Sequence, residues 1–377
     1  MASIRKRRLT GEKIAWLCDY VDANGKRRAK QFPTRKAAEK WLAQTVVHIG
    51  QGLHTPDSAS ITISDAGELW LERCERNDLE VSTVRSYHGL LKHHIKPEIG
   101  NIKLSKLTAP AIERLIDTLL ETRSRTLTKK IIGTLSMIIG DAQRRGLVHQ
   151  NVVSIVRVKI PSREKRTIEI PTKEEVRNMV KNVSDKWRAL LITALFTGLR
   201  ASELRGLCWT NTDLDEAVLH VRQRVDQWRN FGPPKTKAGI RDVPLAPMVV
   251  SELKKWKLRC PVGELDLVFP NGAGKPESHA NLLNRFFWPL QVECGIIKGY
   301  REKEGKKVAL AKYSLHALRH AAASLLIEQG LNSKRIQSIM GHSSITVTMD
   351  TYGHLFEDPE EDKRIMQQVE ASLFNGN

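Results

Sequence analysis

The chain has 377 residues, a formal net charge of +19 at neutral pH and a sequence pI near 9.8, and 41% of its residues are hydrophobic. This length suggests two or three domains, and the hydrophobic content argues against a disordered chain. A positive charge of this size favours a polyanionic partner, and nucleic acid is the first candidate.

Membrane-spanning and secreted proteins are disfavoured by the sequence. The longest apolar run, residues 189–196, is too short to cross a bilayer, and no apolar stretch follows the basic start of the chain as it would in a secretory signal. The cysteines are scattered and form no Cys-x-x-Cys pair. We therefore expect a cytoplasmic protein with reduced cysteines, no structural zinc and no disulfide framework.

The N-terminal residues predict a small β-hairpin followed by a helix. Residues 13–21 alternate as a strand does, Asn24-Gly25 is a strong turn signal, and residues 27–32 would return as the second strand. Apolar residues at helical spacing predict a helix from Thr34 to Val46. The return strand carries basic residues that either bind DNA or face solvent, namely Arg27, Arg28 and Lys30.

A polar stretch without periodicity, residues 51–60, predicts a linker. The next hundred or so residues predict a compact helical bundle. Its helices are expected to start at the capping residues Ser64, Ser82 or Thr83, Thr108 and Ser124. The basic groups Lys92-His93-His94 and Lys129-Lys130 either face DNA or form solvated helix faces.

A second boundary is predicted at residues 156–171, which are basic, contain two prolines and hold few apolar residues. Such a segment predicts an extended linker that can follow a phosphate backbone. Beyond it, Thr172 and Glu175 form a capping box that opens a mixed, mostly helical domain. A short strand pair is expected at residues 218–221 and 241–245.

Four motifs of this last domain carry side chains suited to phosphate chemistry. In the first, Arg200 and Glu203 lie three apart at the start of a predicted helix, a spacing that by itself predicts an ordinary ion pair. The second places Lys235 and Lys237 near the tip of a predicted hairpin, before Val243-Pro244-Leu245. Two residues apart on a strand, these lysines would point the same way, so alternation does not separate them.

The third motif places His316 and Arg319 three apart on one helix face. An imidazole can move a proton near neutral pH, and a guanidinium can hold two phosphate oxygens. In the fourth motif, His342 is expected at a helix end and Tyr352 in a following short helix or loop, where a tyrosine is ordinarily a packed aromatic. Together, however, these cations and a hydroxyl without an acidic metal cluster suit covalent catalysis of phosphodiester cleavage.

The motifs G-L-R-x-S-E-L, the hairpin lysine, H-x-x-R-H, G-H-S-S and T-Y-G-H resemble, in order and approximate spacing, those of the tyrosine recombinases, the family that includes phage integrases. This motif resemblance spans residues 165–356, and the N-terminal half is similar to integrases in layout only. It implies a mainly α, multidomain fold with small β elements. The implied domains are an arm-type DNA-binding domain (1–55), a helical core DNA-binding domain (61–155) and a catalytic domain (165–377).

The resemblance also implies a mechanism. Tyr352 would attack the scissile phosphate to form a 3′-phosphotyrosyl bond, and the released 5′-hydroxyl would later reseal a strand without ATP or another cofactor. His316 would accept the tyrosine proton, and Lys235, which precedes a threonine as the family's lysine commonly precedes a small residue, would protonate the leaving 5′ oxygen in preference to Lys237.

The remaining implied catalytic residues act on the phosphate or on their neighbours. Arg200 and Arg319 would hold the non-bridging oxygens, His342 would hydrogen-bond the phosphate, and Glu203 would orient the basic side chains. The implied partners are double-stranded DNA with core and arm sites and a homotetramer on that DNA, with no membrane involved. An excisionase and a host DNA-bending protein are candidate accessory partners, and a nucleoid-associated location is expected.

Residues 361–373 predict a final helix that either docks on a neighbouring protomer or simply closes the domain. Two alternatives to an integrase remain open from sequence. One is a type IB topoisomerase or telomere resolvase with the same chemistry, which the separate hairpin unit disfavours. The other is a non-catalytic DNA-binding regulator, for which the full set of catalytic residues would be a coincidence.

Overall fold

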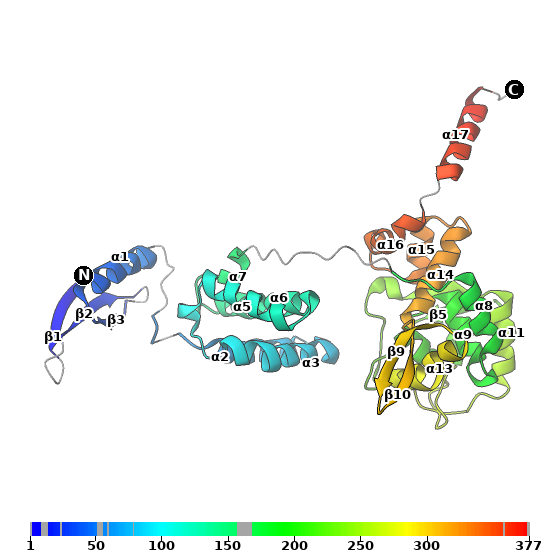
Figure 1. The fold of residues 1–377 in the computed structure, drawn as a ribbon, viewed down its shortest axis with the longest axis horizontal. Coiled ribbons are helices and arrows are strands. Elements are labelled where there is room, and N and C mark those ends of the chain that lie inside the picture. The colour runs from blue at the N-terminus through cyan, green and yellow to red at the C-terminus, as the bar shows by residue number, and fades with distance from the viewer. Residues whose placement is uncertain are drawn as a thin grey trace. The chain divides into compact units, whose positions relative to one another are not determined.

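The computed structural model of the chain describes residues 2–8, 14–22, 25–50, 56–58, 60–77, 79–156, 168–356 and 359–374. The chain divides into two compact units, Met1–Lys165 and Arg166–Asn377, and Figure 1 labels many of their elements. Within the described ranges, no helix combines the length and apolar character needed to cross a bilayer. The expected mainly α fold with small β elements is confirmed.

The first unit opens with a three-stranded antiparallel sheet of β1 (Ser3–Arg8), β2 (Ile14–Val21) and β3 (Arg27–Phe32), followed by α1 (Arg35–Gly50). The helix packs on the sheet through Trp41, whose ring lies 5.3 Å from those of Tyr20 and Phe32. The predicted hairpin is confirmed as β2 and β3, although Lys13 and Asn24 lie outside the described residues. The strand β1 was not predicted, because its sequence SIRKRR holds one apolar residue and so shows no alternation.

The rest of the first unit is the predicted helical bundle. Its helices are α2 (Ile63–Arg76), α3 (Val81–Leu90), which continues through a π-helical turn at Leu91–Ile95 into α4 (Lys96–Ile99), then α5 (Ala109–Thr122), α6 (Arg125–Arg144) and α7 (Val152–Ile155). Thr108 and Ser124 precede α5 and α6 as predicted, whereas α2 starts earlier, behind a capping box of Thr62 and Asp65. Of the two predicted linkers, residues 51–55, 59 and 157–167 lie outside the described part of the chain.

The second unit begins with the predicted capping box of Thr172 and Glu175. Its helices are α8 (Lys173–Asn182), α9 (Asp185–Thr197), α10 (Ala201–Arg205), α11 (Pro247–Lys257), α12 (His279–Asn281), α13 (Trp288–Glu293), α14 (His316–Glu328), α15 (Ser333–Met340), α16 (Ile345–Tyr352) and α17 (Pro359–Phe374). The final helix α17 confirms the helix predicted over residues 361–373.

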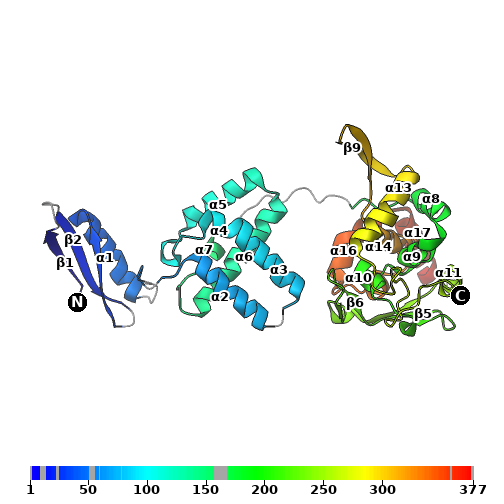
Figure 2. The same cartoon turned by 90° about the horizontal axis from the view of Figure 1, so that it is seen from below.

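The strands of the second unit form small sheets. They are β4 (Thr212–Asp213), β5 (Val218–Val221), β6 (Arg224–Val225), β7 (Phe231–Gly232), β8 (Arg241–Pro244), β9 (Ile297–Lys303) and β10 (Lys306–Ala311). The expected strand pair is confirmed, because β5 and β8 are antiparallel with Val221 opposite Arg241. Figure 2 shows the β9–β10 hairpin, which the sequence did not predict, projecting from the body of this unit.

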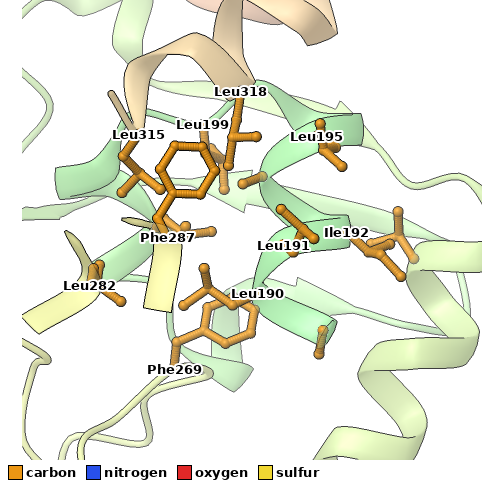
Figure 3. Close-up of a cluster of buried hydrophobic side chains, with 14 of the residues drawn as sticks. Leu190, Leu191, Ile192, Leu195, Leu199, Phe269, Leu282, Phe287, Leu315 and Leu318 are labelled. Carbon is orange, nitrogen blue, oxygen red and sulfur yellow. The ribbon is translucent and has the colours of Figure 1, made fainter. Parts of the chain in front are cut away.

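The core of the second unit forms around α9, which is apolar on nearly all sides. Figure 3 shows Leu190, Leu191 and Leu195 of this helix surrounded by side chains from other segments, among them Phe269, Phe287 and Leu318. A helix that is hydrophobic all round is stable only when it is enclosed, so α9 fixes the centre of the unit. The residues that follow α9 directly are those of the first predicted motif.

Candidate active site

The first catalytic motif is placed by a left-handed glycine. Helix α9 ends at Gly198, whose φ of +59° turns the chain so that Arg200 becomes the N-cap of α10. A Cβ atom at Gly198 would lie 2.7 Å from Sδ of Met340, closer than packed atoms can approach. The turn therefore favours glycine, and any other residue would also displace the Met340 side chain of α15.

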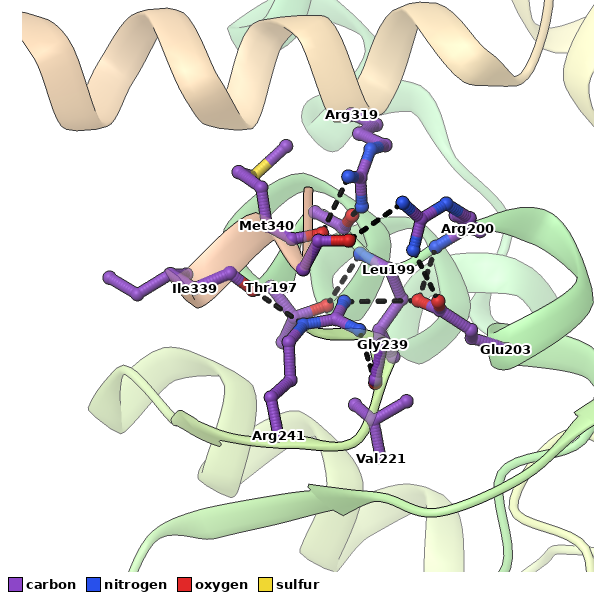
Figure 4. Close-up of polar contacts among 12 residues, drawn as sticks. Thr197, Leu199, Arg200, Glu203, Val221, Gly239, Arg241, Arg319, Ile339 and Met340 are labelled. Atoms are coloured by element: carbon purple, nitrogen blue, oxygen red, sulfur yellow. Dashed lines mark hydrogen bonds and ion pairs between the residues drawn. The ribbon is translucent and has the colours of Figure 1, made fainter. Parts of the chain in front are cut away.

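Glu203 is the centre of an ionic network that is shown in Figure 4. Its carboxylate accepts hydrogen bonds from Nη1 of Arg200 at 2.7 Å and from Nη2 of Arg241 at 3.0 Å. Burial alone would raise the pKa of Glu203, but the charge and hydrogen bond of Arg241, together with Arg200, hold that pKa below its ordinary value. The predicted ion pair of Arg200 and Glu203 is thus confirmed, and Arg241 is an additional member.

Arg200 and Arg319 both hold the chain between α15 and α16. Arg200 donates through Nη2 to the carbonyl of Gly341 at 2.9 Å. Arg319, on α14, donates to the carbonyls of Gly198 at 2.6 Å and Met340 at 2.5 Å (Figure 4). Arg319 is buried, whereas a third of the Arg200 side chain is exposed, so Arg200 offers the more open guanidinium.

Tyr352 is the last residue of α16 and is 1% exposed. Its hydroxyl lies 2.7 Å from Nδ1 of His320, and its ring stacks on that of His342 with centroids 6.3 Å apart. Burial raises the pKa of Tyr352 to about 12, although the charge of Arg319 opposes the increase. The tyrosine is therefore a protonated phenol within a cluster of histidines and arginines.

His342 directly follows the left-handed C-cap Gly341 of α15, as predicted for a residue at a helix end. Its Nδ1 lies 2.8 Å from the hydroxyl of Thr348. Burial and the charges of Arg319 and Arg200 lower the pKa of His342 to about 4, so the ring is neutral at pH 7. A neutral imidazole can donate one hydrogen bond and accept another.

His316 is the first residue of α14 and is exposed. Its ring packs edge-on against His320, with centroids 4.8 Å apart. Surrounding protein atoms and the charges of His320, Arg319 and Arg200 lower the pKa of His316 to about 4. The histidine that hydrogen-bonds Tyr352 is His320. That His316 accepts the tyrosine proton stays a prediction.

Lys235 and Lys237 are both exposed, between β7 and β8. The prediction that they lie two apart on one strand is wrong. Lys235 precedes a 3-10 turn that begins at Lys237, because the chain must bend back before β8. The alternation argument for their directions therefore does not apply.

Two residues of the site were not predicted as functional. His320 is the last residue of the H-x-x-R-H motif, and Arg241 lies just before Val243-Pro244 in the second motif. His320 directly follows Arg319, and Arg241 lies four residues after Lys237, so the sequence signal for each was a titratable side chain within a motif. Only the contacts of the folded chain, to Tyr352 and to Glu203, identify them.

The sequence matches models of one protein family in both units of the chain. The model of the phage integrase family matches residues 169–358, half of the chain, and that of the phage integrase N-terminal SAM-like domain matches residues 62–120. A tyrosine recombinase XerC-like protein of Caldanaerobacter subterraneus is 28% identical, over an alignment that covers 89% of this chain and 90% of that protein. The ICEBs1 integrase of Bacillus subtilis is 24% identical and covers 84% of each chain.

Solved structures show the same fold. The Tn1549 transposon integrase in complex with a circular intermediate DNA has a TM-score of 0.66 at 18% identity and covers 82% of this chain and all of its own. A lambda integrase dimer bound to a core site has a TM-score of 0.60 at 18% identity and covers 95% of this chain and 94% of its own. The family match over the unit that contains Arg200, Arg319 and Tyr352 shows that the chain belongs to the phage integrase family, the tyrosine recombinases that cleave and rejoin DNA.

Proposed function

We propose that the chain is the integrase of a mobile element, such as a prophage or an integrative element, and that Tyr352 is its nucleophile. The observation that carries this proposal is the meeting of Tyr352, His342, Arg319 and Arg200 around the turn at residues 340–342. A scissile phosphate bound at this turn would be close to a hydroxyl and to two guanidinium groups. The phenol oxygen would form a 3′-phosphotyrosyl bond as the bond to the 5′ oxygen breaks.

The basic residues supply the charge that the reaction requires. The pentavalent transition state carries more negative charge on its non-bridging oxygens than the diester does, and a prearranged guanidinium stabilises that charge without reorganising. Arg200 and Arg319 take this role, and neutral His342 hydrogen-bonds the phosphate. Glu203 orients Arg200, and Lys235 protonates the leaving 5′ oxygen. His316, expected from the sequence to accept the tyrosine proton, lies at the start of α14 beside His320.

We propose three DNA-related domains for this activity: residues 1–55 reading arm-type sites, 61–155 reading core sites and 165–377 carrying out the chemistry. Exposed Arg27 of β3, and exposed Lys92 and His93 of the helical bundle, support DNA contact by the first two. The proposed assembly is a homotetramer on DNA, as in the lambda integrase tetramer bound to a Holliday junction. An excisionase and a host DNA-bending protein are proposed accessory partners, and action on chromosomal DNA would place the protein at the nucleoid.

Covalent capture tests the proposal. The chain is incubated with a nicked duplex from the joined ends of the parent element, and the protein–DNA adduct is separated on a denaturing gel. The parent protein should form an adduct at the 3′ side of the break, whereas Tyr352→Phe should bind the duplex equally well and form none. A normal adduct yield from Tyr352→Phe would reject Tyr352 as nucleophile, and an absence of adduct from both proteins would favour a non-catalytic regulator.

A further inference from the structure

His320 has a direct hydrogen bond to the proposed nucleophile. Nδ1 of His320 lies 2.7 Å from the hydroxyl oxygen of Tyr352, and the two rings meet edge-on with centroids 5.7 Å apart. Helix α14 supplies His320 and helix α16 supplies Tyr352, so the contact is created by tertiary packing. Both atoms of this contact are placed to exchange the phenol proton.

The state of the histidine ring suits it to accept a proton. Burial and the neighbouring charge of Arg319 lower the pKa of His320, so the ring is neutral at pH 7. A neutral imidazole with its hydrogen on Nε2 carries a lone pair on Nδ1. The phenol O–H then donates to this lone pair, which is the arrangement required of a general base.

Tyr352 needs such a base because its burial makes it a weak acid. With its pKa raised to about 12, only about one phenol in ten thousand is ionised at pH 8. A base that removes the proton during attack avoids this unfavourable ionisation. The positive charge of Arg319, on the same helix, opposes a free imidazolium on His320, whose ring also packs against that of His316. A bound phosphodiester would bring negative charge to the same place.

We propose that His320 accepts the proton of Tyr352 as the phenol attacks the phosphate. This inference rests on the proposed role of Tyr352 as nucleophile. The bond from the phenol oxygen of Tyr352 to phosphorus forms while the bond from phosphorus to the 5′ oxygen breaks. The phenol proton passes to Nδ1 of His320, and the leaving 5′ oxygen takes a proton from the proposed acid Lys235. During resealing the steps reverse, and His320 returns its proton to the phenol.

Chemical rescue tests the inference. The rate of adduct formation is measured under single-turnover conditions, on the same nicked duplex, for the parent chain and for His320→Ala, His320→Asn and His316→Ala. His320→Ala should be about 10²–10⁴-fold slower, the usual range for loss of a general base, and added imidazole should raise its rate at least about tenfold. His320→Asn, which keeps a hydrogen-bond acceptor but takes no proton, should remain slow.

The variant His316→Ala shows which of the two histidines, His316 or His320, is the general base. His316→Ala should bind the duplex more weakly or react more slowly, yet should not respond to imidazole. Rescue of His316→Ala without rescue of His320→Ala would overturn the inference, as would a normal rate for His320→Asn or for His320→Ala. If His320→Ala does not fold, as judged by circular dichroism and duplex binding, the rate of His320→Asn decides alone.

Failure of the proposed function gives a different pattern. Tyr352→Phe, assayed in parallel, should form no adduct with or without imidazole. An adduct from Tyr352→Phe would place the nucleophile elsewhere, whatever the His320 variants do. If the parent forms the adduct, Tyr352→Phe forms none, and His320→Ala forms it at the parent rate, only the role of His320 is rejected.

Discussion

Glu203 and Arg241 form a buried ion pair across the second unit, with Nη2 of Arg241 3.0 Å from Oε2 of Glu203 and side-chain exposures of 5% and 2% for the arginine and the glutamate. Arg241 also donates to the carbonyls of Gly239 and Ile339. The pair therefore ties β8 and the end of α15 to the start of α10, where Arg200 begins. Its integrity sets the position of a proposed phosphate-binding side chain.

Removing the carboxylate should destabilise the protein. Glu203→Ala leaves Arg241 buried without its counter-ion, a change that typically costs about 3–5 kcal/mol. A thermal melt of the full chain should show a lower transition temperature for the second unit. Asp215→Asn, which alters an exposed ion pair with Lys254, is the matched control and should melt nearly as the parent does.

The same pair predicts the direction of a pH effect. The pKa of Glu203 is lower in the folded chain than in the unfolded chain. Its stabilising contribution is therefore fully present above the unfolded pKa and is lost as the pH falls through the folded pKa. Melting at neutral and acidic pH should show a smaller difference between parent and Glu203→Ala in acid, and a difference that grows in acid would contradict this assignment.

Gly341 should not tolerate a side chain. Gly330 is the control that separates a steric clash from backbone strain. Both have positive φ, +64° and +75°, so an alanine at either is strained by about 1 kcal/mol. A Cβ atom at Gly341 would also lie 2.8 Å from Nη1 of Arg241 and 2.9 Å from the carbonyl of Ala238, whereas the space around Gly330 is open. Gly341→Ala should lose most cleavage activity, and Gly330→Ala should lose only stability; equal activities would show that the contact to Arg241 does not matter.

Lys235 is predicted to be the general acid in preference to Lys237. Loss of the acid should slow cleavage of ordinary DNA by about 10²–10⁴-fold, because a 5′ alkoxide is a poor leaving group. A substrate with sulfur at the 5′ bridging position leaves as a thiolate and needs no proton. Lys235→Ala should be slow on ordinary DNA and nearly normal on the sulfur substrate, with Lys237→Ala mildly affected on both; rescue of Lys237→Ala instead would move the role by two residues.

Removal of residues 1–54 should separate cutting from recombination. The shortened chain keeps Asp57, whose carboxylate accepts a hydrogen bond from Ser105 at 2.9 Å, and so keeps the anchored start of the bundle. It should cleave an isolated core site at the rate of the full chain but lose recombination that depends on a second class of site. Equal recombination by both forms would show that the N-terminal sheet is not a separate DNA reader.

Some helix starts in this chain are determined by residues close to them in the sequence. Thr172 with Glu175, and Ser124 before α6, satisfy backbone N–H groups within three residues, so their effect does not depend on the rest of the fold. The same holds for Arg200 and Glu203, whose ion pair follows from helical spacing. For this reason the catalytic motifs and most helices could be predicted, whereas β1, a strand with almost no apolar residue, could not.

The tertiary structure alone decided which of these residues touch. His316 and His320 belong to one motif. Only the folded position of α16 relative to α14 brings the Tyr352 hydroxyl within hydrogen-bonding distance of His320. Arg241 reaches Glu203 from a strand far along the chain, and the loop between β7 and β8, not a strand, carries the two lysines. Contacts between distant segments depend on how buried apolar faces meet, and a local pattern of residues does not contain that information.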